Sequence, residues 1–76
     1  MMMTYEEWLK STEFGLRRMY KVKDIFIDNE VFHIDFTNNF SYLTSVGNLK
    51  SLWQIDGFIE LCNDIERVFM CQIMNV

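Results

Sequence analysis

The sequence predicts an α+β fold. In this fold an N-terminal helix precedes an antiparallel β-meander of three strands, or four, and a C-terminal helix packs on the sheet. Three observations predict it: a capping-box motif near the N-terminus, apolar residues that alternate over residues 20–45, and apolar residues at helical spacing from residue 55 onward. With 76 residues, of which 50% are hydrophobic and none is alanine or proline, the chain has room for a single small domain, residues 1–76.

The first helix is predicted over residues 4–14, with an extension to residue 18 as the alternative. Thr4-x-x-Glu7 has the spacing of a capping box. One face is then marked at helical spacing by Tyr5, Trp8, Leu9 and Thr12. Gly15 is expected to end this helix as a left-handed cap, although Leu16 continues the apolar stripe beyond it.

The second region is predicted to be a hairpin, because its apolar residues alternate and the polar residues 28–30 interrupt the alternation. A three-residue loop keeps the apolar side chains of both strands on one face, whereas a slip by one residue would move them to the other. The expected register places apolar residues opposite one another: Ile27 with Val31, Phe26 with Phe32, and Val22 with Phe36.

This register has consequences for the charged residues of the hairpin. Lys23 faces Asp35 in a favourable cross-strand pair, and Asp24 falls among apolar residues, where it needs a partner or a sheet edge. A second turn over residues 37–39 then leads to a third strand, residues 40–45, because asparagine tolerates the backbone of tight turns.

Residues 49–55 fit two structures. They alternate well enough for a fourth strand, and Asn48 can also cap a helix that carries Leu49, Leu52 and Trp53 on one face. We favour the helix slightly, because the apolar pattern continues in phase through Ile55 and Phe58.

The C-terminal helix has the clearest pattern in the chain. Its apolar face holds Ile55, Phe58, Ile59, Cys62, Ile65 and Phe69. Leu61 and Val68 widen this face to about half of the circumference, which predicts contact on two sides. Glu66 lies within the apolar arc, and we expect it to pair with Arg17 or Arg18 of the first helix. The apolar tail, residues 68–76, is expected to be a helix end or a short final strand, docked either internally or on a partner.

The titratable residues do not form a pattern typical of a metal, cofactor or catalytic site. Cys62 and Cys71 with the single His33 are too few for a zinc site, so both cysteines are expected to be reduced and packed in the core. No glycine-rich phosphate loop and no paired nucleophile and base are recognisable, so we expect no enzyme activity and no cofactor.

The sequence also predicts the compartment and the class of partner. No run of 18 apolar residues is present and the N-terminal segment has no secretory pattern, so no membrane contact and a cytoplasmic location are expected, in the host cell if a phage encodes the chain. Residues 24–76 hold eight acidic side chains against two basic ones, and the formal net charge is −4, so direct binding of nucleic acid is not expected.

These observations favour a small acidic inhibitor or regulator that binds another protein and has no catalytic activity. The composition implies A/T-rich codons, which the genome of a low-GC bacterium or its phage would produce. The arrangement of elements is similar to that of several small phage inhibitors, without a shared motif. The partner would be a nuclease or defence effector, as for an anti-CRISPR or immunity protein. The alternative is a homo-oligomeric accessory subunit, for instance a dimer. The candidate partner-binding residues combine an acidic ridge with apolar side chains: Asp56, Glu60, Asp64, Leu61, Val68 and Trp53.

Overall fold

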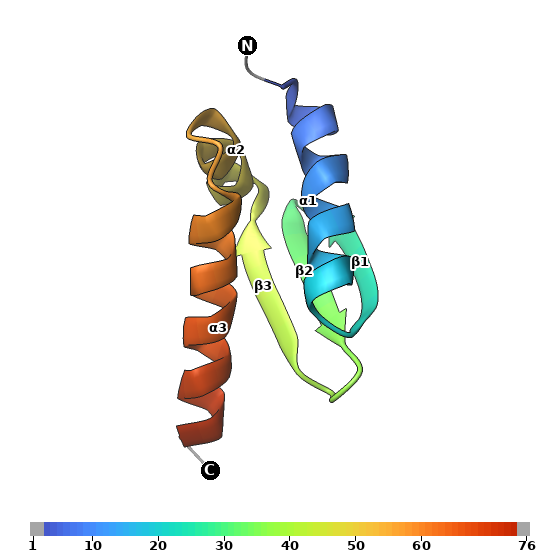
Figure 1. Ribbon diagram of the computed structural model, residues 1–76, viewed down its shortest axis with the longest axis vertical. Coiled ribbons are helices and arrows are strands. Elements are labelled where there is room, and N and C mark those ends of the chain that lie inside the picture. Colours follow the sequence, from blue (N-terminus) through green and yellow to red (C-terminus); the bar gives the residue numbers. More distant parts are fainter. Residues whose placement is uncertain (1–2, 75–76) are drawn as a thin grey trace.

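A computed structural model describes residues 3–74 of the chain and the side chains of residues 3–71. Six elements follow one another: α1 (Tyr5–Met19), β1 (Val22–Asp28), β2 (Val31–Phe36), β3 (Ser41–Ser45), α2 (Val46–Gln54) and α3 (Phe58–Met74). The strands form one antiparallel sheet in the order β1-β2-β3 (Figure 1). The predicted α+β class, N-terminal helix, meander and C-terminal helix are therefore confirmed, and the sheet has three strands.

The helices cover one face of this sheet. A single core joins buried residues of the three helices to the buried side chains of the strands, which include Phe32, Ile34 and Tyr42. On the opposite face the central row pairs Phe26 with His33 and His33 with Leu43, and Leu43 is 57% exposed. The molecule thus has two layers, with the outer face of the sheet open to solvent.

Helix α1 begins as predicted but ends later. The Glu7 amide donates to the Thr4 hydroxyl at 3.2 Å and the Thr4 amide donates to the Glu7 carboxylate at 3.0 Å, which completes the capping box. Gly15 lies inside the helix and does not end it. A Cβ at this position would lie 2.8 Å from the ring of Phe58, so the glycine leaves room for the Phe58 side chain, at the beginning of α3, to pack against α1.

The β1–β2 hairpin has a different register from the predicted one. Its turn has two residues, Asn29 and Glu30, with φ of 53° and 62°, and it pairs Ile27 with Phe32 instead of Val31. Two residues with positive φ are typical of the hairpin turn whose twist matches that of the strands. The prediction failed because glutamate is uncommon in this backbone region, where it costs about 1 kcal/mol or more.

The shifted register changes which side chains reach the core. Ile25 is buried opposite Ile34, and Phe26 faces the open side of the sheet. An irregularity between Val22 and Asp24 then restores the phase, so Val22 pairs with Phe36 as predicted.

The same shift corrects the predicted positions of the charged residues. Lys23 lies in the irregular step and has no cross-strand partner, so its expected pairing with Asp35 is wrong. Asp24 is exposed opposite Asp35 and does not lie among apolar residues. The second turn agrees better with the prediction, since Asn39 has a φ of 69° and the third strand begins one residue later than expected.

Residues 46–54 form a helix, which settles the choice left open by the sequence. Ser45 caps this helix by accepting a hydrogen bond from the Asn48 amide at 3.0 Å. The cap therefore lies three residues before the expected one, Asn48. The Asn48 side chain instead donates to the Thr44 hydroxyl at 2.9 Å. A short α2 therefore follows β3 directly.

Helix α3 buries a different arc from the predicted one. Leu61, Cys62 and Ile65 are buried, whereas Ile55 and Ile59 are 65% and 68% exposed. Asp56, with a φ of 52°, and Gly57 turn the chain between α2 and α3, so the two helices do not share one helical phase. Continuing a single phase through this turn misplaced Ile55, whereas Ile59 lies within α3 on the part of the wide apolar arc that the core does not cover.

The rest of the C-terminal segment is helical as far as the structure describes it. The helix runs to Met74, which favours the helical alternative for the tail, and residues 75–76 lie outside the described residues. Cys62 is buried as predicted. Cys71 is exposed, so its expected place in the core is wrong.

Candidate functional site

The predicted acidic ridge divides into an exposed part and a structural part. Asp56 and Glu60 are exposed, at the turn between α2 and α3 and in the first turn of α3. Asp64 is half-buried and accepts a short hydrogen bond from the Tyr42 hydroxyl, and it forms an ion pair with Arg67 at 3.3 Å. Burial, together with this hydrogen bond, raises the pKa of Tyr42 well above its usual value. Asp64 therefore holds α3 to β3, which leaves Asp56 and Glu60 as the part of the ridge that faces solvent.

The apolar members of the predicted site also serve the fold. Leu61 is fully buried, and Val68 is half-buried against the core. The indole nitrogen of Trp53 donates to the Met3 carbonyl at 2.7 Å, and its ring meets the Tyr5 ring edge-on at 5.9 Å. Leu61 is consequently not available to a partner, and Trp53 joins α2 to the beginning of α1.

A group of exposed side chains surrounds the turn between α2 and α3. We call Ile55, Asp56, Ile59 and Glu60 the corner patch. A Cβ atom on Gly57 would lie 3.2 Å from Cγ1 of Ile55 and 3.2 Å from Oε2 of Glu60. These two side chains therefore flank the glycine. Two apolar side chains that are about two-thirds exposed, Ile55 and Ile59, are each followed in the chain by a carboxylate that forms no ion pair within the described part of the chain.

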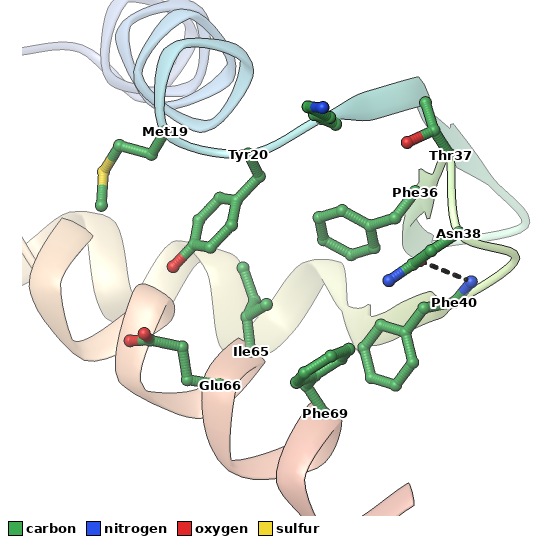
Figure 2. A pocket seen from close by; sticks show the side chains of 10 residues that line it. Met19, Tyr20, Phe36, Thr37, Asn38, Phe40, Ile65, Glu66 and Phe69 are labelled. Atoms are coloured by element: carbon green, nitrogen blue, oxygen red, sulfur yellow. Dashed lines mark hydrogen bonds between the residues drawn. The ribbon is translucent and has the colours of Figure 1, made fainter. Parts of the chain in front are cut away.

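A cavity of about 420 Å³ opens between the end of α1, the β2–β3 turn and the middle of α3 (Figure 2). Its floor is formed by buried side chains, its walls by half-buried Tyr20 and Phe69, and its mouth by exposed residues. The floor holds Phe36, Phe40 and Ile65; the mouth holds Met19, Lys21, Thr37, Asn38 and Glu66. We call this cavity the aromatic pocket.

Four aromatic rings from the floor and the walls of the aromatic pocket contact one another in a row. Tyr20 meets Phe36 edge-on at 5.9 Å, and Phe36 lies 5.8 Å from Phe40. Phe40 in turn meets Phe69 edge-on at 4.8 Å. Such edge contacts stabilise each ring beyond its burial, so the wall is held in place without a ligand.

Glu66 lies at the mouth of this pocket and is exposed. Its predicted pairing with Arg17 or Arg18 is wrong, because the one ion pair among residues 3–71 joins Asp64 and Arg67. The Arg18 guanidinium instead lies over the Phe14 ring, 5.6 Å from its centre. The apolar arc of the helical wheel did identify an unusual position for Glu66, and the structure shows that this position borders a cavity.

Tyr20 supplies a neutral hydroxyl beside this carboxylate. Figure 2 shows the Tyr20 hydroxyl and the Glu66 carboxyl group on the same side of the pocket, and Thr37 and Asn38 on the other. Burial, followed by the neighbouring Cys62 and Glu66, raises the pKa of Tyr20 to about 12. The phenol therefore remains protonated at neutral pH and does not add a negative charge.

The open face of the sheet carries a smaller feature. The His33 ring stacks on Phe26 with 4.5 Å between ring centres and an angle of 6° between the planes. Asp24 and Asp35 face each other in the next row, where the Ser41 hydroxyl donates to Asp35 at 2.9 Å. Within residues 3–71, no three His, Cys, Asp or Glu side chains lie close enough together to hold a metal ion.

The structure and the comparisons add two further findings. No helix in the described range, residues 3–74, is long and apolar enough to cross a membrane. The chain matches no protein-family model, and comparisons with curated proteins and with solved structures likewise give no match. Function is therefore inferred from the surfaces of the chain itself, chiefly the corner patch and the aromatic pocket.

Proposed function

We propose that the protein is a small acidic inhibitor or regulator that occupies the surface of a partner protein and has no catalytic activity. The corner patch is the observation that carries this proposal. Ile55 and Ile59 place two large apolar side chains in solvent, beside the carboxylates of Asp56 and Glu60. An apolar centre with a charged rim is the usual composition of a protein–protein interface.

The charge of the chain favours a basic partner surface. The net charge is −4, and Asp56 and Glu60 add negative charge at the edge of the apolar residues. A partner with a positively charged groove, such as a nuclease or a defence effector that holds nucleic acid, would be attracted over a distance of about one Debye length, roughly 8–10 Å. This supports an inhibitor of the anti-CRISPR or immunity type, encoded by a phage or a mobile element and present in the cytoplasm of the host.

The proposal is tested by binding of the purified protein to purified nucleic-acid-processing effectors at low salt. The variant Ile55→Ser with Ile59→Ser removes the apolar centre of the corner patch and leaves its charges, and we expect at least a tenfold loss of affinity and of inhibition. Phe14→Ser is the matched control, because Phe14 is an equally exposed apolar residue on α1. Effectors that keep full activity in the presence of the protein, or an unchanged affinity of the double variant, would contradict the proposal.

A homo-oligomeric accessory subunit is the second candidate, and the open face of the sheet favours it. Leu43 is 57% exposed there, next to the stacked rings of Phe26 and His33. Light scattering after size exclusion separates the two candidates. A dimer that persists on dilution and is lost in Leu43→Asp supports the subunit, whereas a monomer at all concentrations excludes it.

A further inference from the structure

We infer that the aromatic pocket is a binding site for an arginine side chain, which a protein partner would supply. The inference rests on the proposed function only in so far as the arginine belongs to the partner. The pocket itself is about 420 Å³, within the range of about 300–1,000 Å³ that is usual for small-ligand sites and more than a single side chain needs.

The walls suit the flat face and the aliphatic stem of arginine. Tyr20, Phe36, Phe40 and Phe69 surround the cavity with aromatic carbon. A guanidinium group stacks on aromatic rings and is less strongly hydrated than an ammonium group, so it enters such a site at a lower cost. The methylene groups of the stem would replace water over the rings of the floor.

Glu66 and Lys21 are the two charged residues at the mouth, and Glu66 is the one that can hold a cation. Its carboxylate lies at the mouth and has no ion pair within residues 3–71. An apolar side chain in the pocket would leave this carboxylate partly desolvated and unpaired, and an anion would be repelled by it. A guanidinium can instead donate two parallel hydrogen bonds to the carboxylate, which is the strongest arrangement available to this pair.

The opposite side of the mouth suits the backbone of a bound peptide. The Lys21 carbonyl accepts from the Thr37 amide at 3.0 Å, which places Lys21 beside the β2–β3 turn. The side-chain oxygen Oδ1 of Asn38 accepts from the Phe40 amide at 3.1 Å. The side-chain nitrogen Nδ2 of Asn38 makes no hydrogen bond within residues 3–71 and can donate to a ligand. This amide can donate to a peptide carbonyl, while the guanidinium lies toward Glu66 on the other side of the pocket (Figure 2).

The probe for this site is N-acetyl-arginine methylamide, titrated into the isotope-labelled protein and followed by amide chemical shifts. This probe has 16 heavy atoms, so a gain of about 0.3 kcal/mol per heavy atom, about 5 kcal/mol in all, corresponds to a dissociation constant of about 0.3 mM. We expect saturable shifts at the pocket, including Tyr20, Asn38 and Phe69. The citrulline analogue has the same shape without the charge, and it is expected to bind at least fivefold more weakly.

Two variants make the test specific to the carboxylate. Glu66→Gln is nearly isosteric at an exposed position, and it should weaken binding of the arginine probe about tenfold, the loss expected when a charge-assisted hydrogen bond becomes a neutral one. Glu30→Gln is the matched control, since Glu30 is exposed in the β1–β2 turn at the other end of the sheet, and it should leave the affinity unchanged.

Three results would overturn the inference: no saturable shifts at the pocket up to about 20 mM probe, equal binding of the citrulline analogue, or equal binding by Glu66→Gln. The experiment needs no protein partner. Its failure is therefore distinct from a failure of the proposed function, which is tested through Ile55 in the turn between α2 and α3 and Ile59 in the first turn of α3.

Discussion

Replacing Gly15 with alanine is expected to destabilise the protein, although the same change stabilises most helices. In the interior of a helix, alanine is favoured over glycine by about 1 kcal/mol. At Gly15 the new methyl group would lie 2.8 Å from Cζ and 3.0 Å from Cε1 of Phe58. Overpacking of this kind costs typically about 1–3 kcal/mol. The net expectation is a loss of about 1 kcal/mol in the free energy of unfolding.

Two further substitutions isolate this contact. Phe58→Leu removes the three ring atoms that the methyl group would meet, so in this background Gly15→Ala should reverse its sign and stabilise the protein by up to about 1 kcal/mol. Gly47→Ala in α2 is the matched control, because its nearest neighbour, the Ser45 hydroxyl, is at an ordinary distance of 3.8 Å. This control is expected to stabilise by about 0.5 kcal/mol.

Urea unfolding followed by tryptophan fluorescence measures the parent protein and the four variants (Gly15→Ala, Phe58→Leu, the double variant and Gly47→Ala), because Trp8 is buried against the core. The reasoning is refuted if Gly15→Ala is as stable as the parent protein or more stable. It is equally refuted if the substitution has the same effect with Phe58 and with leucine at that position, since the effect would then not come from the contact between α1 and α3.

Three more predictions concern titratable groups. Tyr42→Phe removes the hydrogen bond to Asp64 and should lower the free energy of unfolding by about 1–2 kcal/mol in urea titrations; an unchanged midpoint would show that the bond contributes nothing. Burial raises the pKa of Tyr20 to about 12, so the neutral phenol stabilises the fold below pH 10 and this contribution is lost as the pH rises from 10 to 12. Thermal melts should show the melting temperature falling over this pH range, and the fall should be less steep in Tyr20→Phe. Cys71 is exposed, whereas Cys62 is buried and its pKa is raised, so a thiol reagent should modify Cys71 promptly and Cys62 only after unfolding. Two equally fast reactions would contradict the burial of Cys62.

Elements with a local cause could be predicted from the sequence. The capping box of Thr4 and Glu7 determined where α1 begins, and the alternation of Phe32, Ile34 and Phe36 determined the buried face of β2. Both signals arise within a few residues, so no tertiary information is needed to interpret them.

Features that depend on two segments at once could not be predicted in the same way. The role of Gly15 depends on Phe58, which lies more than forty residues later in the chain. The observed hairpin register requires a left-handed backbone at Glu30 and an irregular step near Lys23. The alternation of apolar residues indicates neither of these features.

The aromatic pocket illustrates the same limit for the site. Its lining comes from the end of α1, the β2–β3 turn and α3, and none of these segments contains a recognisable binding motif. The one signal present in the sequence was Glu66 within an apolar arc, and this signal indicated an unusual environment without specifying a cavity. Conversely, Leu61 is a candidate partner-binding residue by its position on the helix, but its side chain is fully buried. Helical periodicity alone does not show which part of a wide apolar arc is covered by the core.

Helix α3 carries two residues of the corner patch, Ile59 and Glu60, and the Glu66 of the aromatic pocket, and this constrains how the protein can diverge. Ile59 and Glu66 are seven residues apart, which corresponds to about two turns and a rise of roughly 10 Å. Deleting or inserting one residue between them would rotate Glu66 by about 100° relative to Ile59 and separate the two surfaces. Substitutions along the exposed side of α3 are therefore far easier to accommodate than any change in the length of this segment, so sequence drift in related chains should spare its spacing.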